Sequence, residues 1–167
     1  MGGGIHYAFL FNPQRLGGQP KPVVTDIDAE SKASGRSLGA SGVEDTLAVL
    51  DTGSDFTWLP HSWLQALDIY GRPEDTVDDP TETIAGIVQE TIGIWSLRLR
   101  LNGCCVPGWL RVRCPLSLED RGLTYAVIGQ DVLGKFAMYH NQGRCKGWLK
   151  QVPSGRFAGF LWRLCDL

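Results

Sequence analysis

The sequence lacks a long hydrophobic run, because its uninterrupted apolar stretches are far shorter than the roughly 18 residues that span a bilayer. It also lacks a block of lysine and arginine: 16 basic and 18 acidic residues are scattered along the chain, and the formal net charge is −2. We therefore expect neither a membrane nor a nucleic acid as a partner. Residues 1–6 contain no basic region followed by an apolar core, so no secretory signal is expected either.

The sequence lacks the C-x-x-C spacing of common zinc sites. The odd number of cysteines and the missing signal favour reduced thiols and a cytoplasmic location. The three histidines lie in separate segments without metal-like spacing. The sequence therefore predicts no metal and no cofactor, and buried free thiols are the commoner use of such residues. The five cysteines are Cys104, Cys105, Cys114, Cys145 and Cys165.

The composition suits a single globular domain that is mostly β. Hydrophobic residues make up 43% of the 167 residues and include six tryptophans, which is enough for a core. The 21 glycines and 9 prolines favour turns and strands over long helices. One or two short helices are expected, at residues 60–67, which begin with proline, and at residues 131–136.

Two segments have clear strand patterns, and two others have little to bury. Residues 47–50 are fully apolar, and residues 95–101 alternate strictly between apolar and polar, which predicts a strand with one face in solvent. Residues 29–44 are rich in serine, glycine, alanine and charge, which predicts a flexible loop or a long hairpin tip. The acidic residues 74–82 are predicted to be a solvated loop.

One tetrapeptide carries chemistry: Asp51-Thr52-Gly53-Ser54 follows directly on the apolar strand at 47–50. Asp51 would be the acid and base, Gly53 would allow a tight turn, and the hydroxyls of Thr52 and Ser54 could hold the loop and steer the carboxylate. An ordinary Asx turn has the same composition. Average residue usage yields such a tetrapeptide by chance in roughly one chain of this length in a hundred.

This tetrapeptide has the architecture of the active-site loop of aspartic proteases, in which two carboxylates share one proton. The motif occurs once, because no internal repeat and no second Asp-Thr-Gly are present. A chain with one copy needs the second carboxylate from a partner. The single copy of the motif therefore predicts that the chain dimerises.

The wider sequence resembles the retropepsin-like aspartic proteases. The resemblance rests on residues 48–57, on a glycine-bearing hairpin at Ala85-Gly86-Ile87 where that family has its flap, and on residues 126–134. The last of these, Ala-Val-Ile-Gly-Gln-Asp-Val-Leu-Gly, is similar to the family segment that passes behind the catalytic loop and enters a helix. These three features lie in the order that the family has.

The resemblance implies a single-domain retropepsin-like closed β-barrel that is active as a homodimer, with one Asp51 from each subunit. An extended peptide or protein substrate would lie under two flaps, and Thr52 would interlock with the Thr52 of the partner. Residues 44–142 would form the protease domain, with residues 1–43 as an N-terminal arm and loop. Residues 143–167 would be C-terminal strands or an interface tail of the same domain.

The resemblance also assigns supporting roles behind the loop. Ile128, Gly129 and Asp131 would be structural, with Asp131 capping the helix. Many retroviral members have arginine where this chain has Gln130, and that arginine pairs with an aspartate at the place of Asp55. The predicted function is an aspartic endopeptidase. The alternative is a catalytically inert module with the same fold that dimerises or binds peptides.

Overall fold

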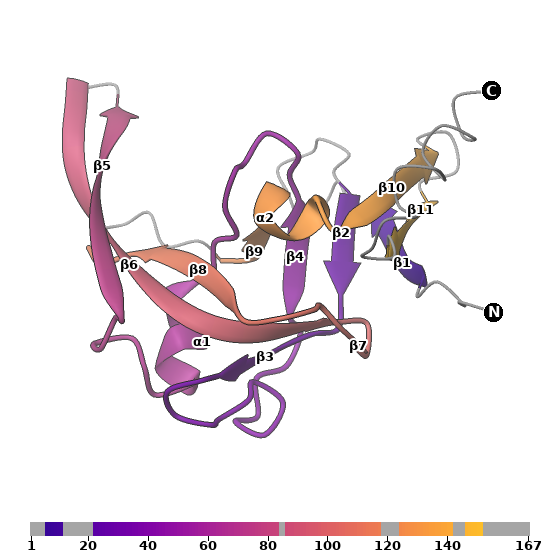
Figure 1. Ribbon diagram of the computed structural model, residues 1–167, viewed down its shortest axis with the longest axis horizontal. Helices are drawn as coiled ribbons and strands as arrows, with labels where there is room; N and C mark the ends of the chain where they lie inside the picture. Colours follow the sequence, from indigo (N-terminus) through magenta and orange to yellow (C-terminus); the bar gives the residue numbers. More distant parts are fainter. Residues whose placement is uncertain (1–5, 12–21, 84–85, 118–123, 142–145, 152–167) are drawn as a thin grey trace.

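The structure is a computed structural model that describes residues 6–11, 22–83, 86–117, 124–141 and 146–151. Within these ranges the protein is mostly β with two short helices, as the composition predicts (Figure 1). The strands are β1 (His6–Phe11), β2 (Pro22–Thr25), β3 (Ile27–Ser31), β4 (Leu47–Leu50), β5 (Asp75–Thr83), β6 (Gly86–Leu101), β7 (Cys104–Cys105), β8 (Leu110–Pro115), β9 (Ala126–Ile128), β10 (Phe136–Asn141) and β11 (Lys146–Gln151). The helices are α1 (His61–Ala66) and α2 (Gln130–Leu133).

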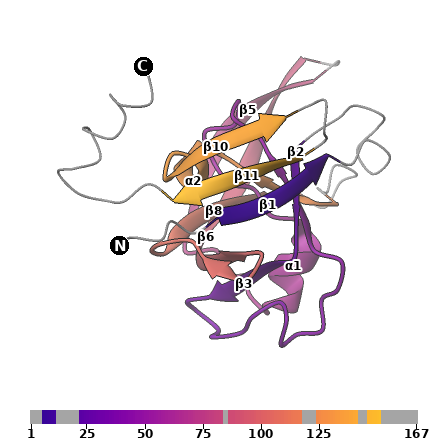
Figure 2. The same ribbon diagram turned by 90° about the vertical axis from the view of Figure 1, so that its right-hand side faces the viewer.

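The first sheet contains six strands in the order β10-β11-β1-β2-β4-β9. Its pairs are antiparallel except β4 and β9, which run parallel with Leu50 opposite Ile128. β1 lies between β11 and β2, so the two ends of the described chain meet in one sheet (Figure 2). This sheet places the end of β4 next to the end of β9.

The second sheet is built on β6, which is 16 residues long and pairs with β3, β5, β7 and β8. Its later half alternates as the sequence predicts. Leu97, Leu99 and Leu101 are fully buried, whereas Arg98 and Arg100 are exposed. The turn after β6 has positive φ at Asn102 and Gly103, which matches the two-residue hairpin turns that favour Asn-Gly.

Trp58 joins the two sheets. Its backbone forms a parallel bridge to Arg113 of β8 and an antiparallel bridge to Val127 of β9. The described strands thus pair as two sheets connected at one residue, and their ladders do not close into the single barrel that we expected. The mostly-β class with short helices is confirmed.

A continuous core fills the space between the sheets and α1. Its largest fully buried side chain is Trp95, whose indole N–H donates a 2.8 Å hydrogen bond to the carbonyl of Ile69. Leu59, Leu64 and Leu67 bring the segment around α1 into the same cluster. α1 begins after Pro60, where the sequence predicts it.

The prediction of a solvated loop at residues 74–82 is wrong, because most of this segment is strand β5. β5 pairs with β6 from Asp75 opposite Ile94 to Thr83 opposite Gly86. It lies at the edge of its sheet, where charged residues and Pro80 are tolerated because one side of the strand needs no partner. The pairing with β6 therefore makes this acidic segment a strand.

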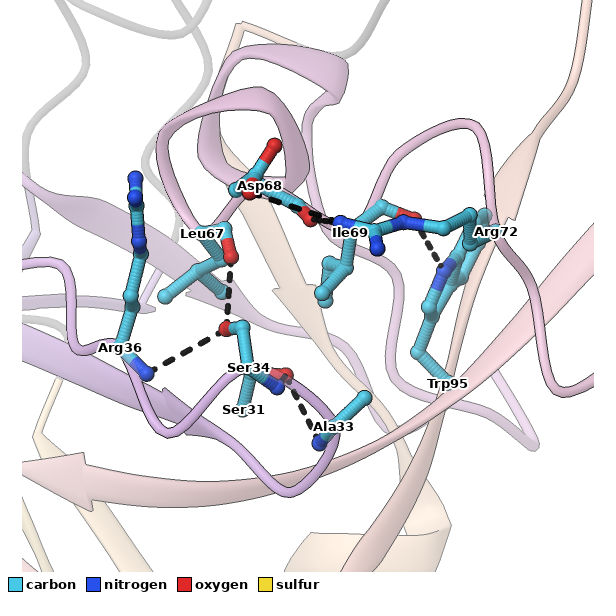
Figure 3. Close-up of polar contacts among 9 residues, drawn as sticks. All are labelled: Ser31, Ala33, Ser34, Arg36, Leu67, Asp68, Ile69, Arg72 and Trp95. Atoms are coloured by element: carbon cyan, nitrogen blue, oxygen red, sulfur yellow. Dashed lines mark hydrogen bonds and ion pairs between the residues drawn. The ribbon is translucent and has the colours of Figure 1, made fainter.

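Residues 29–44 also differ from the prediction, because they have more to bury than their composition suggests. Leu38 is fully buried, and the Ser34 hydroxyl donates a 2.7 Å hydrogen bond to the carbonyl of Leu67 after α1 (Figure 3). The Ser31 hydroxyl accepts hydrogen bonds from the backbone N–H groups of Ala33 and Ser34. Local side-chain bonds of this kind stabilise a turn without regular structure.

In the described part of the chain, neither helix could cross a membrane.

Candidate active site

Asp51 follows directly on β4, and its side chain is exposed. Its backbone N–H donates a 3.0 Å hydrogen bond to the carbonyl of Ile128, which continues the parallel pairing of β4 and β9 by one residue. The backbone then turns at once, because the N–H of Ser54 donates to the Asp51 carbonyl at 3.2 Å. The carboxylate accepts the N–H of Gly53 at 2.9 Å. The sequence thus places an oriented carboxylate at the end of a buried strand.

The other residues of the tetrapeptide hold the turn. The Ser54 hydroxyl donates a 2.7 Å hydrogen bond to the carbonyl of Phe56, so its proton stabilises the loop and is not given to the Asp51 carboxylate. Thr52 is exposed. A Cβ atom on Gly53 would lie 3.2 Å from Oδ1 of Asp51, so glycine leaves room for the carboxylate to approach the backbone.

Gly129 lies immediately behind this loop. A Cβ atom at this position would collide with the carbonyl oxygen of Phe56 and would lie 2.8 Å from that of Ser54. The N–H of Gln130 donates a 2.8 Å hydrogen bond to the same Ser54 carbonyl. The segment after β9 therefore packs against the loop backbone to backbone, which only glycine permits.

Asp131 binds the far end of the loop. Its carboxylate accepts the Thr57 hydroxyl at 2.7 Å and the Thr57 N–H at 3.1 Å, and the same hydroxyl accepts the N–H of Gly129. The expectation that Asp131 caps the helix is wrong. α2 has Gly129 at its N-cap and no side-chain cap hydrogen bond. The carboxylate instead binds the buried Thr57, so that the hydroxyl both donates and accepts a hydrogen bond.

Gln130, the first residue of α2, also contacts the loop. Its amide Nε2 donates a 2.9 Å hydrogen bond to the carbonyl of Thr52. In the same region the N–H of Asp131 donates to the carbonyl of Asp55 at 3.2 Å. A neutral amide thus contacts the backbone of the tetrapeptide at the position where the resemblance led us to look for an arginine.

The predicted flap falls on the hairpin of β5 and β6. Gly86 opens β6 with φ +120°, a conformation that favours glycine, and Ile87 beside it is 73% exposed. Ala85 lies outside the described residues. Figure 1 shows the loop after β4 rising beside α2, toward the same side of the molecule as the far end of this hairpin. The two features are therefore on one face of the protein.

Burial and hydrogen bonding shift the pKa of two groups outside the tetrapeptide, Cys114 and Glu74. Burial raises the pKa of the Cys114 thiol on β8 to about 12, and the negative charge of Glu90 adds to this effect. Hydrogen bonds from Ser96 lower the pKa of the Glu74 carboxyl below its ordinary value: the Ser96 hydroxyl donates at 2.6 Å and its N–H at 3.1 Å. Neither group contacts the tetrapeptide.

Other polar features lie away from Asp51. A hollow of about 330 Å³ lies between the turn at residues 33–36 and the end of α1, where Arg36 and Arg72 flank it (Figure 3). His61 contacts the Pro115 carbonyl at 2.7 Å and packs edge-on against Tyr70. Among the described residues no group of histidine, cysteine and acidic side chains could hold a metal ion.

Sequence reasoning missed two contributors to this site. Thr57 belongs to an apolar stretch in which its hydroxyl gives no signal of its own. Arg113 lies 57 positions after Phe56 in the sequence, yet its guanidinium carbon lies 3.3 Å from the centre of the Phe56 ring. Only the bridge from β8 to Trp58 brings Arg113 to the loop. A contact of this range has no local sequence pattern.

Comparison with known proteins supports the fold. No protein-family model matches the chain, and no curated protein sequence matches it. The structure is similar to that of a retropepsin-like aspartic protease from Rickettsia conorii, with a TM-score of 0.54 and 12% identity over 90% of this chain and 97% of that one. A protease from simian foamy virus is 20% identical over 65% of this chain and 90% of that one. Its TM-score of 0.38 is too low to carry a fold assignment. The chain therefore has a retropepsin-like fold.

Proposed function

We propose that this protein is an aspartic endopeptidase in which Asp51 is the catalytic carboxylate. The observation that carries the proposal is the exposed Asp51 side chain at the end of β4, oriented by the Gly53 N–H. The loop that bears it is held from behind by Gly129 and Asp131. In the proposed reaction, the ionised carboxylate of a pair takes a proton from a water molecule, which attacks the peptide carbonyl while the protonated carboxyl of the pair donates its proton to the carbonyl oxygen. The C–N bond of the resulting tetrahedral intermediate then breaks, and the amine leaves with a proton returned by the pair.

The proposed active form is a homodimer, because each chain supplies one Asp51 and the reaction needs two carboxylates close together. Thr52 would lie beneath the pair and contact the partner's copy of the same loop. The hairpin of β5 and β6, with Gly86 and Ile87 near its tip, would cover an extended peptide substrate. The odd number of cysteines supports a reducing location such as the cytoplasm.

The first test is the variant Asp51→Asn, assayed on an unstructured protein between about pH 3 and pH 8, a range that includes the titration of carboxylates. We expect it to lose cleavage and to keep the fold by circular dichroism. Asp68→Asn is the matched control, since Asp68 is an exposed carboxylate that pairs with Arg72 after α1. Full activity in Asp51→Asn would remove Asp51 from the mechanism.

A mixing experiment tests the dimer. Asp51→Asn added in excess to the wild-type protein should lower the wild-type activity, because heterodimers contain only one of the two carboxylates. A monomeric enzyme would keep its activity in the same mixture. Peptide binding without cleavage by the wild-type protein at every pH would favour the inert peptide-binding module instead.

A further inference from the structure

Phe56 and Arg113 form a stacked pair beside the candidate active site. The guanidinium carbon of Arg113 lies 3.3 Å from the centre of the Phe56 ring, and Phe56 is 38% exposed. In the described part of the protein, few large hydrophobic side chains are exposed, and Phe56 is one of them. Stacking on a ring holds a guanidinium group in one plane.

Arg113 faces away from the core. On β8 the side chains of Val112 and Cys114 are fully buried, so Arg113 between them points to the opposite face of the strand. Its backbone N–H donates to the carbonyl of Thr57, which secures β8 against the segment after the loop. The strand and the loop therefore place the stacked pair from two directions.

The guanidinium of Arg113 has no carboxylate partner among the described residues, although its neighbour on the same face has one. Arg111 forms a 3.0 Å ion pair with Asp75 of β5. Asp55 precedes Phe56 directly and forms no ion pair with Arg113. Stacking occupies the face of the guanidinium and leaves the N–H groups at its edge able to bind an oxygen ligand in a bidentate manner.

The pair lies within reach of a peptide bound at Asp51. Phe56 lies five positions after Asp51, and that length of chain spans at most about 18 Å even when it is fully extended. The turn at Ser54 shortens it further. An extended peptide of about six residues would cover such a distance.

We propose that Arg113, held by Phe56, is a specificity-determining residue that selects an acidic side chain of the substrate a few residues from the scissile bond. This inference rests on the proposed peptidase function. It assigns the substrate carboxylate, from Asp or Glu, to the edge of the Arg113 guanidinium. The same site should discriminate against the neutral amides Gln and Asn, which carry no charge to complete the pair.

The test is cleavage of a mixed peptide library with identification of the products by mass spectrometry. The wild-type protein should enrich Asp and Glu at one fixed position relative to the cut. Arg113→Gln should lower the ratio of kcat/KM for a Glu peptide to that for the matched Gln peptide by about tenfold or more, since a charge-assisted hydrogen bond is lost. Arg111→Gln is the matched control, because it removes an equal charge two residues away and should keep the preference.

Three further variants separate recognition from folding. Arg113→Glu should shift the preference at the same position from acidic to basic side chains, which a purely structural role would not produce. Phe56→Leu should weaken the acidic preference because the guanidinium loses the aromatic ring on which it stacks, whereas Phe56→Tyr should keep it. Melting temperatures would identify any variant that fails to fold.

The outcomes are distinct. Cleavage by the wild-type protein without an acidic preference overturns this inference and leaves the proposed function in place. A preference that survives Arg113→Gln, or that disappears equally in Arg111→Gln, also overturns it. A wild-type protein that cleaves no peptide in the library overturns the proposed function, and this inference with it.

Discussion

The hydroxyl of Thr57 donates a 2.7 Å hydrogen bond to the carboxylate of Asp131, across 74 positions of sequence. The same hydroxyl accepts the N–H of Gly129, and Thr57 is fully buried. Breaking one of these bonds would leave a buried polar group without a partner, which is costlier than the bond itself is favourable. The arrangement holds the end of the loop after Asp51 against the start of α2.

Thr57→Val tests this relationship. It keeps the size and branching of the side chain and removes the hydroxyl, so we expect the free energy of unfolding to fall by about 1–3 kcal/mol. Thr57→Ser keeps the hydroxyl and should lose less. Chemical unfolding of the three proteins measures the effect. Equal stability of the valine and wild-type proteins would show that the hydrogen bonds contribute nothing.

Gly129→Ala should be more damaging than an ordinary glycine substitution. Its Cβ atom would collide with the Phe56 carbonyl and crowd that of Ser54, so the backbone must move. We expect a loss of at least about 2 kcal/mol in the free energy of unfolding, as in overpacked cores. Gly71→Ala is the control, because no atom lies within 4 Å of its Cβ position and its φ is not positive. Two equally stable variants would contradict the close approach.

Glu74 should make the stability depend on pH. Its pKa is lower in the folded chain because Ser96 donates two hydrogen bonds to the carboxylate. The stabilisation is therefore complete above the ordinary Glu pKa of 4.5 and is lost as the pH falls through the lowered folded-state value. Glu74 is exposed, so solvent screens the interaction, and Glu74→Gln should cost no more than about 0.5 kcal/mol at neutral pH. Unfolding at several pH values should show this difference shrinking toward acid, and a difference that grows would contradict it.

Cys114 should resist alkylation in the folded protein. Burial raises its pKa to about 12, so almost none of the reactive thiolate is present at pH 8. Cys105 is exposed and provides the internal comparison. Peptide mapping after iodoacetamide treatment should find label on Cys105 and none on Cys114, and both should react after denaturation. Rapid native labelling of Cys114 would show that β8 opens readily.

The sequence predicts well those elements whose partners are close in the chain or whose pattern is strong. The alternation at residues 95–101 predicts the second half of β6, and the proline at position 60 marks the start of α1. β5 was missed because its acidic residues suit a loop equally well. Only its pairing with β6 makes that segment a strand. An edge strand has one free side, so its own sequence is weakly constrained.

The candidate site likewise has local features that the sequence predicts and long-range contacts that it does not. The order strand, aspartate, small turn is local, so the sequence alone determined that Asp51 follows β4 and that Gly53 can turn the chain back toward its carboxylate. The tertiary structure decided which groups support that loop, because those contacts join segments more than 50 residues apart. Asp131 binds Thr57 and does not cap its helix, and Arg113 stacks on Phe56. Long-range contacts depend on sheet topology, which no short pattern in the chain encodes.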